Sequence, residues 1–355
     1  MSASRKILIY HLASLGDILV ALPALRLIRD NNKLSQITML TPRHIKPGAV
    51  DVEKVIGEMN IIDNYIYLNL NYKRSRMWFE AFKEIKRGNF STLYYLNQER
   101  ELKEIVRDRI FFSLCGINKI IGANFSEKLR KPILNDLGES ESMRSFLVRK
   151  INTSRGIDSD SFDAYGISQN KIKKYPWIDS TLSKNKIISF SIGTKLEIKD
   201  WGHERWAELI NRVSESYPEY LIVAIGGEVD REKTNSILEN IKDNYINFSG
   251  DLTISQSMYV LTKSQVFICH DSGPMHLAAA VGVKTISIFS SICPPGLWFP
   301  AGPNNKVFYT RIECEGCAKL ECIALKKKCI LSISVSDVFN EIEKSIQNEK
   351  GYIEC

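Results

Sequence analysis

One stretch of the sequence combines a buried strand, a polar turn and a helix in an order that suits anion binding. The apolar run Val266–Cys269 predicts a short buried strand, and the turn His-Asp-Ser-Gly-Pro follows it. Small and apolar residues from Met275 to Val281 predict a helix. Asp271 and Ser272 are helix-capping residue types, and Pro274 suits the first helical position. The free N–H groups of such a helix start attract anions, so we expect a phosphate-bearing ligand here. The alternative is an ordinary strand-to-helix turn in an α/β core.

A second turn whose residues could bind a ligand or take part in catalysis lies near the N-terminus. The loop Ser14-Leu15-Gly16-Asp17 follows a predicted strand, Lys6–His11, and precedes a predicted helix from Ile18 to about Arg29. Open α/β sheets bind ligands at the carboxyl ends of their strands. Gly16 allows close approach of the backbone, and Asp17 is either the N-cap of the helix or a reactive carboxylate. Pro23 either kinks this helix or marks its true start.

Polar and charged side chains also follow the predicted strands of the second half of the chain. They are Thr194, Lys195, Lys199, Asp230, Asp271 and His276, with Glu228 as a rival to Asp230. Each has a structural alternative, because lysines are mostly exposed and a histidine on a first helical turn often caps or packs. No G-x-G-x-x-G follows the first strand, and P-loop, H-E-x-x-H and G-x-S-x-G motifs are absent, so the sequence lacks these common nucleotide-binding and hydrolase signatures.

Four of the eight cysteines form a cluster, and the other four are scattered. The cluster consists of Cys314, Cys317, Cys322 and Cys329. In a cytosolic chain a disulfide framework is disfavoured, so this segment is either a metal site or a set of reduced structural thiols. Its later spacings differ from those of a common zinc ribbon.

Strand and helix signals alternate twice along the chain, which predicts an α/β protein made of two Rossmann-like domains facing a central cleft. We expect a first domain with its linker over residues 1–176 and a second over 177–334 that includes the Cys-rich segment 314–329. A C-terminal helix and tail occupy 335–355. The polar, irregular stretch from about Asn135 to Pro176 is the predicted linker.

Composition narrows the class of function. The chain has 355 residues, 44% hydrophobic and 25% charged, with a formal net charge of +7. No apolar run approaches the roughly 18–20 residues that span a bilayer, and the N-terminus lacks a signal-peptide pattern, so a cytoplasmic location is expected. The net charge fits an anionic substrate or a visit to an anionic membrane surface. The basic run Tyr72–Trp78 is too isolated to indicate nucleic-acid binding.

Three segments together resemble glycosyltransferase family 9, the ADP-heptose heptosyltransferases. Ser14–Ile18 with Leu22-Pro23-Ala24 looks like the N-terminal motif of that family. The stretch Asp271–Ala280 resembles its main C-terminal motif, and Lys199-Asp200-Trp201 before Glu204 is similar to a third. The order and separations also fit, and the resemblance spans about Lys6 to Glu343.

The resemblance implies a GT-B fold and an inverting, metal-independent transfer of heptose from ADP-heptose to a lipopolysaccharide core sugar. It implies that Asp17 is the catalytic base in an acceptor-side loop with Ser14 and Gly16, and that Lys199 lies near the leaving diphosphate. The implied donor-binding residues are Thr194 and Lys195 in a phosphate-side turn, Asp230 at the ribose, the backbone of Ser272, Gly273 and Met275, and Asp271 and His276 near the sugar and phosphates.

The implied partners are an ADP-sugar donor and a lipid-linked or glycan acceptor, with the inner-membrane surface as one location and no nucleic acid. No cofactor is implied for catalysis. The cysteine segment resembles one in many family members, and relatives that modify autotransporter proteins bind iron through cysteines there, so the resemblance allows a structural metal.

The chain departs from the family pattern in two places, the loop Ser290–Trp298 and the stretch Tyr67–Glu101. The first lies near the implied sugar pocket and the second on the acceptor side. Three hypotheses therefore stay open: a heptosyltransferase, a transferase with another nucleotide sugar or a protein acceptor, and a non-catalytic nucleotide-sugar-binding protein.

Overall fold

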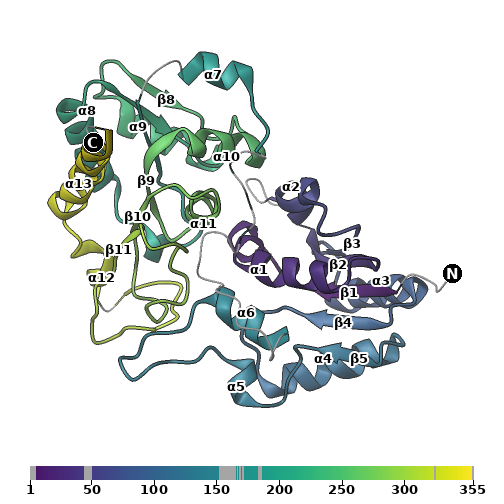
Figure 1. The fold of residues 1–355 in the computed structure, drawn as a ribbon. Helices are drawn as coiled ribbons and strands as arrows, with labels where there is room; N and C mark the ends of the chain where they lie inside the picture. The colour runs from purple at the N-terminus through teal and green to yellow at the C-terminus, as the bar shows by residue number, and fades with distance from the viewer. Residues whose placement is uncertain are drawn as a thin grey trace. The chain divides into compact units, whose positions relative to one another are not determined.

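The computed structural model describes residues 5–43, 50–151, 165, 167, 169, 172–182, 186–323 and 325–353. The chain divides into two compact units, the first containing β1 to α6 and the second containing α7 to α13 (Figure 1). Tyr165 belongs to the first unit and the chain from Ile167 onward to the second, ahead of the predicted boundary at 176. Part of the predicted linker, residues 152–164, lies outside the described residues.

The first unit is a parallel five-stranded sheet with the strand order β3-β2-β1-β4-β5. The strands are β1 Lys6–Tyr10, β2 Gln36–Arg43, β3 Asn64–Asn69, β4 Thr92–Tyr95 and β5 Lys119–Ile121. The helices are α1 Leu15–Asn31, α2 Val52–Ile56, η1 Gly57–Met59, α3 Arg74–Gly88, α4 Leu102–Leu114, α5 Glu127–Arg130 and α6 Met143–Ile151.

The predicted start of the first helix is wrong by about one turn. Helix α1 begins at Leu15, and Pro23 lies inside it, so the proline does not mark the start. Ser14, in extended conformation, is the N-cap, and a capping box with Asp17 supplies partners for the first turn. The capping interactions at the start of α1 therefore fix the conformation of the loop that follows β1.

The second unit is a parallel six-stranded sheet with the order β11-β10-β9-β6-β7-β8. Its strands are β6 Lys186–Ser191, β7 Tyr220–Ala224, β8 Tyr245–Asn247, β9 Ser264–His270, β10 Thr285–Ile288 and β11 Lys306–Phe308. Its helices are α7 Pro176–Leu182, η4 Glu197–Lys199, α8 His203–Ser216, η5 Glu228–Asp230, α9 Arg231–Leu238, α10 Ile254–Thr262, α11 Gly273–Ala280, α12 Lys328–Leu331 and α13 Val335–Ile353. Two parallel, helix-covered sheets confirm the predicted fold class.

The C-terminal helix is part of the second unit. Val338, Phe339 and Ile342 of α13 are buried in one core cluster with Trp206 and Ile210 of α8, and the two helices lie beside each other (Figure 1). Among the described residues, no helix combines the length and the apolar character needed to cross a membrane.

Candidate functional site

The loop after β1 holds Asp17 at the third position of α1, not at its N-cap. The backbone N–H and the hydroxyl of Ser14 donate to Oδ2 of Asp17 at 2.7 and 2.6 Å. The side-chain amide of Gln98 donates to Oδ1 at 2.7 Å. The interpretation of Asp17 as the N-cap is therefore wrong, because Ser14 takes that position. The carboxylate is partly exposed and is held at both oxygens, so its orientation is fixed.

The segment after β4 supports this loop through three consecutive residues. His11 Nδ1 donates to the carbonyl of Leu96 at 2.6 Å, Leu12 N–H donates to Asn97 Oδ1 at 2.8 Å, and Gln98 reaches Asp17. Strands β1 and β4 are adjacent and parallel, so their carboxyl ends meet at one edge. Sequence reasoning missed Asn97 and Gln98, although polar residues directly after a predicted strand were the signal that could have found them.

A buried lysine, Lys150, contacts the segment that follows β4. Lys150 Nζ donates to the carbonyl of Asn97 at 2.6 Å and lies 5.3 Å from the ring centroid of Tyr95. Burial lowers the pKa of Lys150 to about 7, and the nearby charges of Arg100 and Arg149 act in the same direction. The hydrogen bond from Lys150 ties α6 to the segment that orients Asp17.

In the second unit, the predicted strand, turn and helix are present as β9, the turn and α11. The helix begins at Gly273, two residues earlier than predicted, so Pro274 takes its second position. Ser272 is the extended N-cap, and its buried hydroxyl has no hydrogen-bond partner among the described residues. Gly273 and Met275 each carry a first-turn N–H, whereas Pro274 carries none. The arrangement offers hydrogen-bond donors to an anion.

An ion pair joins two of the predicted site residues beside this helix start. Lys199 Nζ lies 2.5 Å from Asp271 Oδ2, and the side chains are only 18% and 9% exposed. Lys199 ends the single-turn helix η4, whereas Asp271 directly follows β9. A shielded ammonium next to free helix N–H groups can stabilise developing negative charge on a phosphate oxygen.

A residue of the Cys-rich segment holds η4 in place. Lys327 Nζ lies 2.6 Å from Oε1 of Glu197 and 3.2 Å from the carbonyl of Asp200. Glu197 and Asp200 flank Lys199 in the chain, so this contact fixes the backbone that presents the ammonium. No local sequence pattern indicates a role for Lys327, because its partners lie about 130 residues away.

His270 fixes the strand end that carries Asp271. Its Nδ1 donates to the carbonyl of Ile192 at 3.0 Å, and its Nε2 accepts from Trp201 N–H and Trp206 Nε1–H, both at 3.1 Å. This pattern requires a neutral ring, since protonated Nε2 could accept neither bond. Burial lowers the pKa of His270 to about 4.

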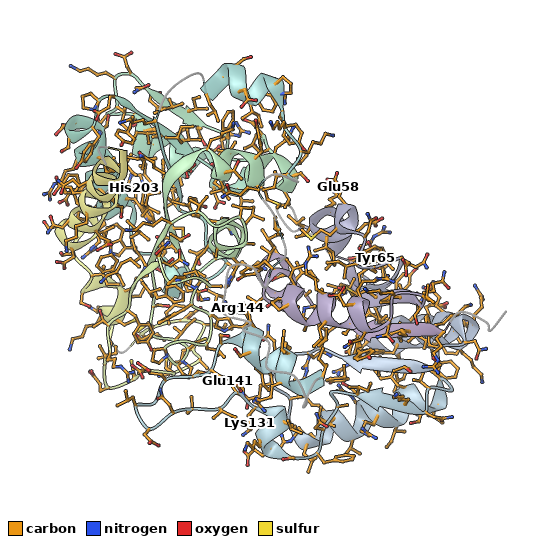
Figure 2. The ribbon with its side chains drawn as sticks, viewed as in Figure 1. Glu58, Tyr65, Lys131, Glu141, Arg144 and His203 are labelled. Carbon is orange, nitrogen blue, oxygen red and sulfur yellow. The ribbon has the colours of Figure 1, made fainter. Side chains whose placement is uncertain are left out.

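His270 should make the protein less stable in acid. The unfolded histidine takes up a proton near pH 6.5, whereas the folded one resists protonation until about pH 4. The contribution is therefore complete above pH 6.5 and is lost as the pH falls toward 4, by about 3 kcal/mol in unfolding free energy. The difference in unfolding free energy between pH 7 and pH 4.5, determined by urea unfolding, measures this loss. His270→Gln should flatten the dependence, while His203→Gln, at an exposed position on α8 (Figure 2), should leave it unchanged. Equal pH dependence in both variants would contradict the assignment.

Asp230 lies against the glycine turns that follow β6 and β7. A Cβ at Gly193 would lie 2.5 Å from Oδ2 of Asp230, so a side chain there would displace the Asp230 carboxylate. Gly227 N–H donates to the same oxygen at 3.0 Å, and burial raises the pKa of Asp230. The rival Glu228 is exposed and pairs with Arg231 at 3.2 Å, so Asp230 is the carboxylate at these turns.

The two candidate donor-binding residues in the turn after β6, Thr194 and Lys195, differ in their contacts. The Thr194 hydroxyl hydrogen-bonds within the turn, with the N–H and carbonyl of Leu196. Lys195 is exposed. No contact links the Lys195 side chain to Lys199, Asp230 or Asp271 among the hydrogen bonds and ion pairs of the described residues.

A family model described as glycosyltransferase family 9 (heptosyltransferase) matches residues 147–328, just over half of the chain. The chain belongs to glycosyltransferase family 9. The match covers all donor-side candidates of the second unit and stops short of Asp17.

Curated relatives and solved structures agree with this membership. Lipooligosaccharide heptosyltransferase 2 of Campylobacter jejuni is 25% identical over 171 residues, which cover 46% of this chain and 52% of that protein. The chain thus matches about half the length of this curated relative. A family 9 glycosyltransferase from Veillonella parvula superposes with a TM-score of 0.73 at 18% identity, covering 98% of this chain and 99% of that one. The E. coli ADP-heptose LPS heptosyltransferase II gives 0.66 at 16% identity, with 97% and 99% covered. These two structures show the shared GT-B fold.

The loop that departs from the family 9 pattern lies beside the ion pair. Trp298 contacts His276 of α11 edge to face, with ring centroids 6.2 Å apart. Burial raises the pKa of the Cys293 thiol, the Lys199 ammonium opposes that rise, and Asp271 and Cys317 add to it. Cys293, which the sequence grouped with the scattered cysteines, is therefore an electrostatic neighbour of Lys199 and Asp271.

The Cys-rich segment of this family 9 chain brings its thiols near one another. Desolvation and the neighbouring Cys317, Cys329 and Cys322 raise the pKa of Cys314. The described cysteines are all free, but within the described ranges no three His, Cys, Asp or Glu side chains are grouped so that they could hold a metal ion. The metal site allowed for Cys314, Cys317, Cys322 and Cys329 stays a prediction.

Proposed function

We propose that this chain is an inverting glycosyltransferase that moves a heptose from ADP-heptose to a lipopolysaccharide core sugar or a related glycan. The observation that carries the proposal is the shielded Lys199–Asp271 pair at the start of α11. It combines an ammonium and free backbone donors, which is what a leaving diphosphate needs. The E. coli protein with the same fold is an ADP-heptose LPS heptosyltransferase.

The second unit binds the donor in this proposal. The N–H groups of Gly273 and Met275 donate hydrogen bonds to the diphosphate, and Lys199 offsets the charge that grows on it as the glycosidic bond breaks. Asp230, held against the glycine turns, accepts hydrogen bonds from the ribose hydroxyls. Lys195, being exposed, contributes long-range attraction only.

The first unit activates the acceptor. Asp17 takes the proton from the acceptor hydroxyl, whose oxygen bonds to the anomeric carbon of the heptose while the bond from that carbon to the diphosphate oxygen breaks. Attack opposite to the leaving group inverts the anomeric configuration. Ser14 and Gln98 hold the carboxylate in one orientation for this step. Of the two implied acceptor classes, lipid-linked or glycan, we propose the lipid-linked one, with the reaction in the cytoplasm at the inner-membrane surface.

A second candidate keeps the chemistry and changes the sugar. The loop Ser290–Trp298 departs from the family pattern and contacts His276 through Trp298. Because His276 belongs to the helix that is proposed to bind the diphosphate, a different loop at this position favours a different sugar on the same nucleotide.

Ligand-induced stabilisation distinguishes the two candidates. A ligand at a hundred times its dissociation constant stabilises the folded state by about 2.7 kcal/mol, which raises the melting temperature by several degrees. We expect ADP-heptose to give the largest shift, ADP-glucose and ADP smaller ones, and UDP- and GDP-sugars none. A thermal-shift panel at equal concentrations measures this. A larger shift with ADP-glucose supports the second candidate, and a larger shift with a UDP- or GDP-sugar contradicts both.

A further inference from the structure

Helix α4 carries an exposed apolar stripe with no role in the proposed reaction. Leu102, Val106, Ile110 and Leu114 follow one another at four-residue spacing and are 45%, 42%, 58% and 66% exposed. Four residues correspond to slightly more than one helical turn, so these side chains share one face. The opposite face of α4 packs on the sheet through Ile105 and Phe112. A helix that covers a sheet normally exposes polar residues on its outer face.

Helix α3 extends this surface. Phe111 of α4 lies 5.0 Å from Trp78 and 6.3 Å from Phe82 of α3, measured between ring centroids, so the two helices pack side by side. On the outer face of α3, Phe79 is 56% exposed. We call the outer surface of the two helices the α3–α4 face; its apolar members are Phe79, Leu102, Val106, Ile110 and Leu114.

Basic side chains accompany the apolar ones. Helices α3 and α4 together contain eight lysines and arginines and four acidic residues. Of the acidic residues, Asp108 is buried and Glu80 is paired with Lys83. Lys83 lies over the ring of Phe79, 4.2 Å from its centroid, and Lys86 is close enough to Cys115, at the end of α4, to influence its thiol. Lys83 and Lys86 therefore place positive charge beside the exposed ring of Phe79 and near the end of α4.

We propose that the α3–α4 face docks the protein on an anionic lipid bilayer. Aliphatic and aromatic side chains that enter the headgroup region, surrounded by lysine and arginine, are the pattern of interfacial membrane helices. Their ammonium and guanidinium groups reach the lipid phosphates while their stems cover apolar surface. The proposal rests on the proposed function in one respect, which is that the acceptor is lipid-linked. The face belongs to the unit that carries Asp17, so docking brings the acceptor-side unit to the membrane that contains the acceptor.

Vesicle binding by the full chain tests the docking surface without any sugar nucleotide. We expect co-sedimentation with vesicles of phosphatidylethanolamine and phosphatidylglycerol, weaker binding at high salt, and little binding to pure phosphatidylcholine. Ile110→Glu should lower the partition coefficient about tenfold or more, because it puts a charge in place of apolar area that docking on the bilayer would bury. Leu34→Glu, at a residue of the same unit that is 92% exposed but outside this face, should bind like the wild type.

Circular dichroism and the ADP thermal shift establish that both variants are folded. Equal vesicle binding by Ile110→Glu and Leu34→Glu, or no binding of the wild type to anionic vesicles, would overturn the docking surface. A wild-type dimer that Ile110→Glu turns into a monomer in light scattering would also overturn it, because a second copy would then cover the face. Transfer to a soluble acceptor analogue is measured separately, so loss of the proposed activity and loss of docking are distinguishable.

Discussion

Asp17→Asn is expected to reduce sugar transfer by about 10²–10⁴-fold while nucleotide-sugar binding persists. An amide has the shape of the carboxylate but cannot take the proton of the acceptor hydroxyl, and a positioned general base contributes about that factor. Binding should persist because the proposed donor residues all belong to the second unit. The turnover number of Asp17→Asn, compared with its ADP-heptose thermal shift, measures the two effects separately.

Ser14→Ala is the matched control for this prediction. It removes the hydroxyl that donates to Asp17 Oδ2 and weakens the cap of α1, but it leaves the carboxylate in place. Losing such a cap costs about 0.5–2 kcal/mol of stability. We therefore expect Ser14→Ala to lower the melting temperature more than the rate, and Asp17→Asn to do the opposite. Near-normal turnover in Asp17→Asn would leave the carboxylate with a capping role alone.

The fold could be predicted because buried parallel strands appear in the sequence as continuous apolar runs. Ile7–Tyr10 and Val266–Cys269 are such runs, and both lie in interior strands of their sheets. The elements that were missed are short. Helices α2, α5 and α12 have four or five residues, too few for a helical period to be visible, and β11 has three.

The site could be predicted only where residues are close in the chain. Asp271 and the start of α11 were found together because one strand and one helix place them. The pairing of Lys199 with Asp271 spans 72 residues, and Gln98 reaches Asp17 across 81. Only the order of strands in the sheet brings such residues together, and that order is not visible in local patterns. For the same reason Cys293 was not predicted as a neighbour of the site. It lies near Lys199 and Asp271, although in the sequence it belongs to a Pro- and Gly-rich loop.

Lys199→Met is expected to lower the rate of transfer by about 10²–10³-fold, the usual effect of removing one group that stabilises transition-state charge. The effect should fall on the turnover number more than on the Michaelis constant, since the charge on the diphosphate grows as the bond breaks. The substitution also leaves Asp271, 9% exposed, without its cation. Breaking a buried pair in this way costs up to about 3–5 kcal/mol, so a loss of activity alone could reflect a loss of folding.

A double-variant comparison separates these two effects. Lys199→Met with Asp271→Asn removes both charges, so much of the stability lost in Lys199→Met should return. The rate should not return, because the ammonium is still absent. The wild type, both single variants and the double variant are compared by urea unfolding and by single-turnover transfer. These measurements give the coupling energy between Lys199 and Asp271 for stability and for the transfer rate. If stability and rate recover together, the pair is structural and the diphosphate takes its positive charge from elsewhere. If only stability recovers, Lys199 acts on the reaction, and Asp271 keeps the ammonium in position for it.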